Sequence, residues 1–171
     1  MKILVTGIAE FIGFHGALLL LDEGYKVVGF DNLNDYYNVQ WKIDRLKELQ
    51  VQKFDKNLIS LKSNLRFIRA DLLEKGLLMN LWKEEQFDYV IHLAAQAGVR
   101  CSSEAPQKYI DSNITGFLNI LVCCWNYPVN HLVFASGSSV YVLIAIIPFS
   151  TEVPISLYAA SKKLNELMAH A

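Results

Sequence analysis

The sequence Met1-Lys-Ile-Leu-Val-Thr-Gly-Ile-Ala-Glu-Phe-Ile-Gly13 opens the chain and decides its fold. Residues 3–5 read as a short buried strand, Gly7 as a tight turn, and Gly13 as the start of a helix. A strand that runs into such a turn directs backbone N–H groups and a helix N-terminus at one point, where phosphate groups bind. The segment therefore predicts a site for a dinucleotide pyrophosphate. Glu10, however, places a carboxylate where a middle glycine is expected.

Composition and charge restrict the class of protein. The 171 residues are 53% hydrophobic and 19% charged, and their formal net charge is −1. These values are typical of one compact α/β domain and give no basic footprint for nucleic acid. The longest apolar run, 140–149, is shorter than the roughly 20 residues that a membrane span needs, and the N-terminal apolar segment is too short for a signal peptide. We expect a cytoplasmic protein that binds neither nucleic acid nor membrane.

Neither the cysteines nor the histidines are spaced as metal ligands. We interpret the cysteines as free thiols in a reducing compartment: Cys101, Cys123 and Cys124. The histidines are scattered over separate predicted elements, so we expect no metal site: His15, His92, His131 and His170.

Short apolar runs alternate with longer amphipathic stretches along the chain. Strands are expected at 3–5, 26–30, 65–68, 89–93 and 131–135, and helices at 13–23, 41–50, 73–85, 107–126 and 157–169. This alternation predicts a doubly wound parallel sheet of about five strands, the Rossmann fold, with helices on both faces. We expect residues 1–171 to form a single dinucleotide-binding domain, with no room for a separate substrate domain.

Residues at the ends of the predicted strands form a second line of evidence. Asp31 ends the second strand, near the spacing of about 20 residues at which an acid binds the adenosine ribose; it would repel a 2′-phosphate, which favours NAD over NADP. Residues 70–72 follow the third strand and could meet the adenine. The small residues at 93–95 follow the fourth strand and would let a cofactor approach the backbone. Ordinary packing at strand ends is the alternative for both segments.

Tyr158 and Lys162 are four residues apart and share one face of a predicted helix. A nearby ammonium lowers the pKa of a phenol, which suits a general base that removes a hydroxyl proton during hydride transfer. Ser136-Gly-Ser-Ser139 follows the fifth strand, where its hydroxyls could bind a sugar and share a proton with Tyr158.

These motifs together resemble the extended short-chain dehydrogenase/reductase family, specifically its NAD-dependent nucleotide-sugar epimerases. The shared pieces include 5–7, 11–13, 31–33, 92–95, Asn113, 138–141 and the Tyr158/Lys162 pair. The segments 32–37, 96–100 and 156–160 are most similar to the UDP-glucuronate 4-epimerase branch. The resemblance implies oxidation and reduction at the sugar C4 through a 4-keto intermediate.

The resemblance also assigns roles. Tyr158, Lys162 and Ser138 are the expected catalytic residues, and Arg100 and Ser138 are expected to contact an acidic sugar. The expected cofactor-binding residues are Gly7, Phe11, Ile12, Gly13, Asp31, Asn32, Asp71, Leu72, Leu93, Ala94, Ala95, Asn113 and Lys162. The expected partner is a nucleotide sugar, either a UDP-uronic acid or a UDP-hexose.

The sequence departs from the family pattern at several points. Glu10 replaces a glycine of the phosphate turn; charge repulsion, an added Cβ and a positive φ would lower NAD affinity at least about a hundredfold. Gly137 stands where the family has its catalytic Ser or Thr. Val142 replaces a glycine, and the apolar segment 140–149 predicts an added strand or an oligomer contact. We expect the family's substrate-binding portion to be absent from residues 1–171, and therefore expect these residues alone to be inactive.

Two other interpretations stay open. The chain could be a non-catalytic Rossmann module, a fragment or an engineered variant, that binds nucleotide weakly or not at all. It could also serve another reaction of the same family, such as a sugar 4,6-dehydratase or a reductase. A dehydratase would be expected to carry acidic residues beside the catalytic hydroxyl, and 136–139 supplies none.

Overall fold

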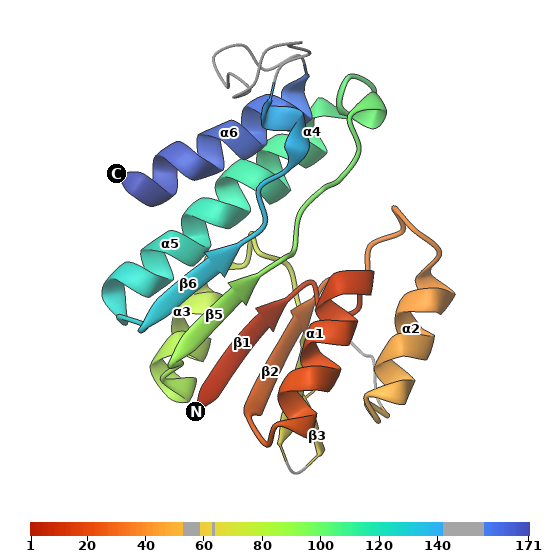
Figure 1. Ribbon diagram of the computed structural model, residues 1–171, viewed down its shortest axis with the longest axis vertical. Helices are drawn as coiled ribbons and strands as arrows, with labels where there is room; N and C mark the ends of the chain where they lie inside the picture. Colours follow the sequence, from red (N-terminus) through yellow and green to blue (C-terminus); the bar gives the residue numbers. More distant parts are fainter. Residues whose placement is uncertain (53–58, 63, 142–155) are drawn as a thin grey trace.

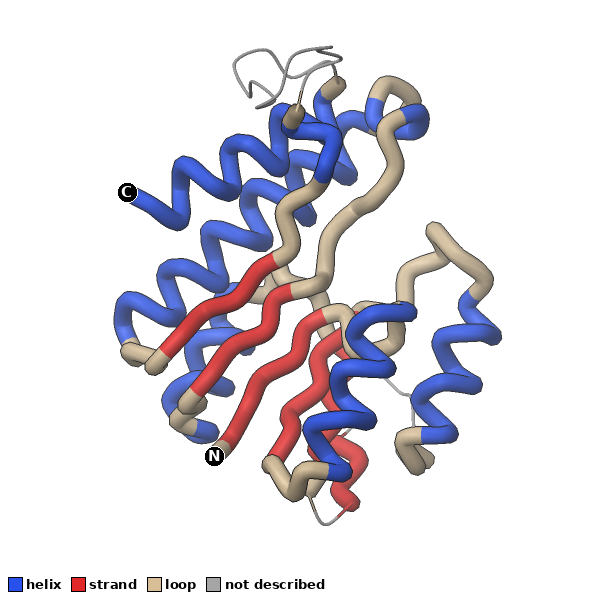
Figure 2. Tube along the Cα trace, in the orientation of Figure 1, coloured by secondary structure: helices blue, strands red, loops and turns tan. Residues whose placement is uncertain are grey.

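The structure, a computed structural model, describes residues 1–52, 59–62, 64–141 and 156–171. Within these residues the chain forms a six-stranded sheet of order β3-β4-β2-β1-β5-β6 (Figures 1 and 2). Five of the described strands are parallel: β1 (Lys2–Thr6), β2 (Lys26–Asp31), β4 (Leu65–Arg69), β5 (Tyr89–His92) and β6 (His131–Phe134). The predicted doubly wound parallel sheet is confirmed.

The helices lie close to their predicted positions. They are α1 (Phe11–Asp22), α2 (Val39–Glu48), α3 (Lys75–Glu85), α4 (Pro106–Tyr109), α5 (Phe117–Asn126) and α6 (Leu157–His170). Between α4 and α5 the chain forms a π-helix, η2 (Ile110–Gly116), so the single helix expected over 107–126 has a widened middle. Two 3₁₀ turns, η1 (Arg100–Ser102) and η3 (Ser138–Val140), complete the described helical segments.

One strand was not expected from the sequence. β3 (Ile59–Lys62) pairs antiparallel with β4 at the edge of the sheet, with Ile59 opposite Ile68. The sequence of β3, Ile59-Ser-Leu-Lys62, alternates apolar and polar residues over only four positions, so it lacks the apolar run by which the equally short β5 and β6 are recognised. The segment 140–149, expected to add a strand or an oligomer contact, lies largely outside the described residues; of it only Val140 and Tyr141 are described.

The core consists of two apolar layers, one on each face of the sheet. Along β1, Ile3 and Val5 pack against α1 and α2, whereas Leu4 packs on the opposite face against α3 and α5. Figure 1 shows these two pairs of helices on opposite sides of the strands. Because both faces are covered, the three central residues of β1 are all apolar, as in buried parallel strands. None of the described helices has the length and apolar character needed to cross a bilayer.

Two glycines allow the close contact at the first β–α corner. Gly7 has a φ of +72°, and a Cβ there would lie 2.9 Å from the backbone nitrogen of Ala94. A Cβ on Gly13 would overlap the carbonyl oxygen of Gly7. Gly7 also donates its N–H to the carbonyl oxygen of Phe30 at 2.8 Å. The corner therefore brings α1 against the ends of β1, β2 and β5, as the sequence predicts.

We predict that Gly13→Ala destabilises the fold, because the overlapping atoms belong to the backbone and cannot rotate away. The expected loss is about 1–3 kcal/mol of unfolding free energy, measured by urea denaturation. Gly16→Ala is the matched control on the same helix, since a Cβ there meets nothing within 4 Å. The control should stabilise by up to about 1 kcal/mol through helix propensity. Equal effects of the two variants would contradict this account of the corner.

Candidate functional site

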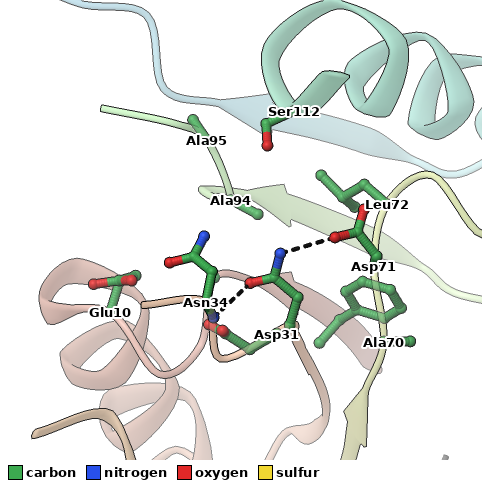
Figure 3. A pocket seen from close by; sticks show the side chains of 12 residues that line it. Glu10, Asp31, Asn34, Ala70, Asp71, Leu72, Ala94, Ala95 and Ser112 are labelled. Carbon is green, nitrogen blue, oxygen red and sulfur yellow. Dashed lines mark hydrogen bonds between the residues drawn. The ribbon is translucent and has the colours of Figure 1, made fainter. Parts of the chain in front are cut away.

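A pocket lies where the carboxyl ends of β1, β2, β4 and β5 converge (Figure 3). The two neighbours of β1 in the sheet, β2 and β5, are reached by crossovers that run in opposite directions, and ligands bind at this switch point in doubly wound sheets. The lining residues come from the loops after these strands and from η2: Gly7, Glu10, Phe30, Asp31, Asn32, Asn34, Ala70, Asp71, Leu72, Ala94, Ala95 and Ser112.

Asp31 is held rigidly at the end of β2. Its Oδ2 accepts the N–H of Ala9 at 3.1 Å, and its Oδ1 accepts the N–H of Leu33 at 2.8 Å. Burial raises the pKa of this carboxyl above its ordinary value. Each carboxylate oxygen can accept a second hydrogen bond. Asp31 therefore joins the glycine corner to β2 and keeps acceptor capacity toward the pocket.

Asn32 and Asp71 connect the neighbouring strand ends. The Nδ2 of Asn32 donates to the Oδ2 of Asp71 at 2.9 Å, and its Oδ1 accepts the N–H of Asn34 at 3.0 Å (Figure 3). Asn34 and Ser112 also line the pocket, although neither was predicted. Asn34 could have been found as part of a polar turn directly after a buried strand. Ser112 gave no such signal, because its position depends on the π-helix.

Glu10 forms an ion pair that the sequence did not predict. Its Oε1 lies 2.7 Å from the Nζ of Lys42, whose side chain is 1% exposed. Lys42 also donates to the backbone and side-chain oxygens of Asn34, both at 2.9 Å. The φ of Glu10 is −82°, so the expected positive φ is wrong: the residue is the extended N-cap of α1. Its charge faces the pocket but is offset by a buried cation.

The other predicted residues of the first turn and of the β5 loop contribute mainly backbone to this region. Phe11 and Ile12 are 64% and 66% exposed at the start of α1. The N–H of Leu93 bonds to Thr6, and Ala94 and Ala95 line the pocket. The Glu10 side chain does not cap α1, and the first-turn N–H groups of a helix have no partner within the helix itself. Cofactor contacts by these residues stay a prediction.

Asn113 joins the loop after β5 to α6. Its Oδ1 accepts the N–H of Gln96 at 2.8 Å, and its Nδ2 donates to the Gln96 carbonyl and to Ser161 Oγ, both at 3.0 Å. Asn165 donates in turn to the Asn113 carbonyl at 2.6 Å. Asn113 is buried in η2, and π-helical turns are frequent at functional sites. The residue therefore fixes the position of α6, which carries Tyr158 and Lys162.

The expected lowering of the Tyr158 pKa is wrong for this structure. Burial, followed by the nearby Tyr109 and Tyr37, raises the pKa of Tyr158. Lys162 shares its helix face, but its Nζ donates to the carbonyl oxygen of Ala135 at 2.9 Å. Burial lowers the pKa of Lys162 itself to about 8. Desolvation, which penalises both charged forms, is the first cause of both shifts.

The polar residues after β6 differ in their contacts and in their exposure to solvent. Ser136 donates to Glu166 Oε1 at 2.6 Å, and the predicted catalytic residue Ser138 is exposed. Gly137 faces Tyr158, since a Cβ on it would lie 3.4 Å from the phenolic oxygen. Arg100, predicted to contact an acidic sugar, is exposed on η1. The roles of Ser138 and Arg100 stay predictions.

His92 is a buried neutral base beneath the site. Its Nδ1 lies 2.8 Å from Thr6 Oγ1. Burial, aided by the charge of Lys162, lowers the pKa of His92 to about 3. In the described part of the chain, His, Cys, Asp and Glu side chains form no group that could hold a metal ion.

Comparisons with known proteins agree with the fold. A family model described as GDP-mannose 4,6 dehydratase matches residues 4–171. Protein CapI of Staphylococcus aureus is 48% identical over 174 residues, which cover 99% of this chain and 49% of that protein. UDP-glucuronate 4-epimerase 4 of Arabidopsis thaliana is 42% identical over 175 residues, covering 99% of this chain and 38% of that protein. The chain thus spans half or less of the length of these relatives.

Solved structures give the same result. The UDP-glucuronic acid 4-epimerase of Bacillus cereus, in complex with UDP-glucuronic acid and NAD, superposes with a TM-score of 0.83 at 33% identity; the match covers 99% of this chain and 51% of that one. The UDP-glucose 4-epimerase of Thermus thermophilus, in complex with NAD, gives a TM-score of 0.78 at 31% identity, over 99% of this chain and 50% of that one.

We predict that Glu10→Gln destabilises the fold, because Lys42 stays buried and loses its carboxylate partner. The expected loss is about 1 kcal/mol, since Glu10 is itself partly exposed and therefore screened. Asp44→Asn is the matched control: it breaks the exposed ion pair between Lys47 and Asp44 on α2, the helix that carries Lys42. That change should cost under about 0.5 kcal/mol in urea denaturation. An equal loss of unfolding free energy in both variants would show that the Glu10–Lys42 ion pair stabilises the fold no more than the exposed pair does.

His92 predicts a specific loss of stability in acid. Between pH 6.5 and pH 3 the unfolded chain binds a proton on His92 that the folded chain does not, so stability falls as the pH drops. From pH 7 to pH 5 the expected extra loss is about 2 kcal/mol. His92→Gln should remove this part of the pH dependence in urea denaturation, whereas His131→Gln, an exposed control, should leave it unchanged. A pH slope unaffected by His92→Gln would contradict the assignment.

Proposed function

The chain belongs to the family whose model is described as GDP-mannose 4,6 dehydratase, and we propose that it is the NAD-binding part of a nucleotide-sugar 4-epimerase. The observation that carries the proposal is the pocket at the switch point, bounded by the glycine corner, Asp31 and the small residues after β5. Support comes from the similarity to epimerases solved with NAD and to UDP-glucuronate 4-epimerases. We propose a UDP-uronic acid or a UDP-hexose as the substrate.

The residues present fit a dinucleotide. Gly7 and Gly13 leave the space that backbone approach to a pyrophosphate requires, and α1 directs unpaired N–H groups there. Asp31 offers carboxylate oxygens for the ribose hydroxyls and would repel the 2′-phosphate of NADP. Asn32, Asp71 and Leu72 would border the adenine side, and Ala94 and Ala95 would let the cofactor lie close to β5.

The chemistry proposed for this site is reversible oxidation at the sugar C4. NAD, when bound, would supply the acceptor and later the donor of the C4 hydride. Tyr158 would remove the proton of the sugar 4-hydroxyl and later return it to the C4 oxygen, once the keto sugar has turned and presents the opposite face of C4 to the hydride. Lys162 would hold the nicotinamide ribose. Asn113 holds α6 in place through Gln96 and Ser161.

We propose further that residues 1–171 make one NAD-binding domain. The part of the relatives that this chain does not match would supply the sugar pocket, so these residues alone should not turn over a nucleotide sugar. A cytoplasmic location suits a protein whose cysteines are free thiols. We propose Ser138 and Arg100 as sugar contacts, since both are exposed beside this end of the sheet.

The decisive experiment is a calorimetric titration with NAD and with NADP. The ion pair with Lys42 offsets most of the charge repulsion expected between Glu10 and the pyrophosphate. Two effects still lower the affinity for NAD: the space that the Glu10 side chain takes up, and the competition between Glu10 and the phosphate for Lys42. We therefore predict weak NAD binding by the natural sequence, about tenfold tighter binding by Glu10→Gly, and weaker binding of NADP than of NAD by both. Glu23→Gly, on an exposed carboxylate at the far end of α1, is the control and should not change the affinity.

The outcomes separate the two candidate functions. If neither the natural sequence nor Glu10→Gly binds NAD, the proposal fails and the chain is a non-catalytic Rossmann module. If the natural sequence binds NAD and Glu10→Gly changes nothing, the cofactor site stands and the proposed effect of Glu10 is wrong.

A further inference from the structure

Gly137 leaves a gap of side-chain size directly in front of Tyr158. Its φ of −168° and ψ of 151° are those of extended backbone, which any residue can adopt. A Cβ at this position would lie 3.4 Å from the phenolic oxygen of Tyr158 and 3.6 Å from Ser139 Oγ. Both are ordinary van der Waals distances. A single small group at this point would therefore touch the hydroxyl groups of both residues.

Ser139 presents a buried hydroxyl without a partner. Its Oγ is inaccessible to solvent and makes no hydrogen bond within the residues that the structure describes. Its neighbours are different, because Ser136 is bonded to Glu166 and Ser138 is exposed. A buried hydroxyl that lacks a partner costs about 1–3 kcal/mol, so such groups are rare and usually have a function or a bound water.

We propose that Ser139 takes the place of the hydroxyl missing at Gly137, through one water molecule held in the gap between Ser139 Oγ and Tyr158 Oη. The proposal rests on the proposed function for the identity of the reaction, but the hydrogen-bonded unit belongs to the protein without cofactor or substrate. Both oxygens lie close to the open side of Gly137, and a water bonded to both would have the two polar partners that a bound water requires. Ser139 is then a positioning residue for Tyr158.

The bridge would oppose the factors that make Tyr158 hard to ionise. Burial, and after it Tyr109 and Tyr37, raise the pKa of Tyr158, and Lys162, one helical turn away, donates to Ala135. Ser139 donates a hydrogen bond to the water, and the water donates one to Tyr158, which stabilises the phenolate. During the reaction the phenolate of Tyr158 takes the proton of the substrate hydroxyl, and the bridge, which neither gains nor loses a proton, holds the phenolate in place.

The test is the pKa of Tyr158, measured by NMR on protein labelled with ¹³C at the tyrosine Cζ, with Tyr158→Phe to assign the signal. Ser139→Ala should raise this pKa by about one unit, a tenfold change in the ionisation constant. Ser103→Ala, at an exposed serine whose hydroxyl donates to the carbonyl oxygen of Arg100, is the control and should not shift it. Gly137→Ser places a hydroxyl in the gap at acceptable distances and should lower the pKa. In the double variant Gly137→Ser, Ser139→Ala, the effect of Ser139 should largely disappear.

Several results would overturn the proposal. One is an equal pKa in Ser139→Ala and in the natural sequence; another is a Ser139 effect that survives unchanged in the Gly137→Ser background. Urea denaturation adds a second measurement: a bridged hydroxyl makes Ser139→Ala destabilising, whereas an unbridged one makes it neutral or stabilising. These experiments need neither NAD nor sugar. A failed NAD titration with an intact pKa shift would reject the proposed function and keep the bridge, and the reverse pattern would do the opposite.

Discussion

The contact between the backbones of Gly7 and Gly13 is the constraint on which the rest of the structure depends. With no side chain on either residue, α1 approaches β1 so closely that a Cβ would overlap a carbonyl group. The same corner lies against Ala94 in the loop after β5. The pocket exists because the ends of β1, β2, β4 and β5 and the start of α1 converge there. A bulkier corner would separate α1 from the sheet and move Asp31 away from Ala9.

The sequence predicted those features that follow from local patterns. Buried parallel strands read as short apolar runs, and all five were found within one or two residues of their true ends. Asp31, Asp71 and the alanines after β5 could be placed because they directly follow such runs. In contrast, β3 has no continuous apolar run, unlike the equally short β5 and β6. The π-helix was missed because it differs from an α-helix by a single extra residue in the turn.

Features set by contacts between distant residues could not be read from the sequence. Lys42 shows no pattern that marks it as the partner of Glu10, and only the fold brings α2 to the first turn. The pKa of Tyr158 was predicted from a helical spacing that is correct, yet burial dominates and Lys162 turns to Ala135. Ser139 likewise becomes notable only when the gap at Gly137 is seen beside it. Sequence patterns located the site, but its electrostatics required the structure.

Glu10 and Gly137 change the site in opposite ways. Glu10 adds a charged group, and the fold supplies a buried cation that holds it, so the corner is satisfied without a bound anion. Gly137 removes a hydroxyl, and the surrounding polar groups are left with a gap. Lys42 is already paired with Glu10. A phosphate that binds to Lys42 must compete with the Glu10 carboxylate, so it gains only the difference between its own interaction with Lys42 and that of Glu10. At Lys42, the ion pair that stabilises the corner therefore lowers the affinity for a dinucleotide. At Gly137, in contrast, a small added side chain has room and can contact Tyr158 without disturbing the fold.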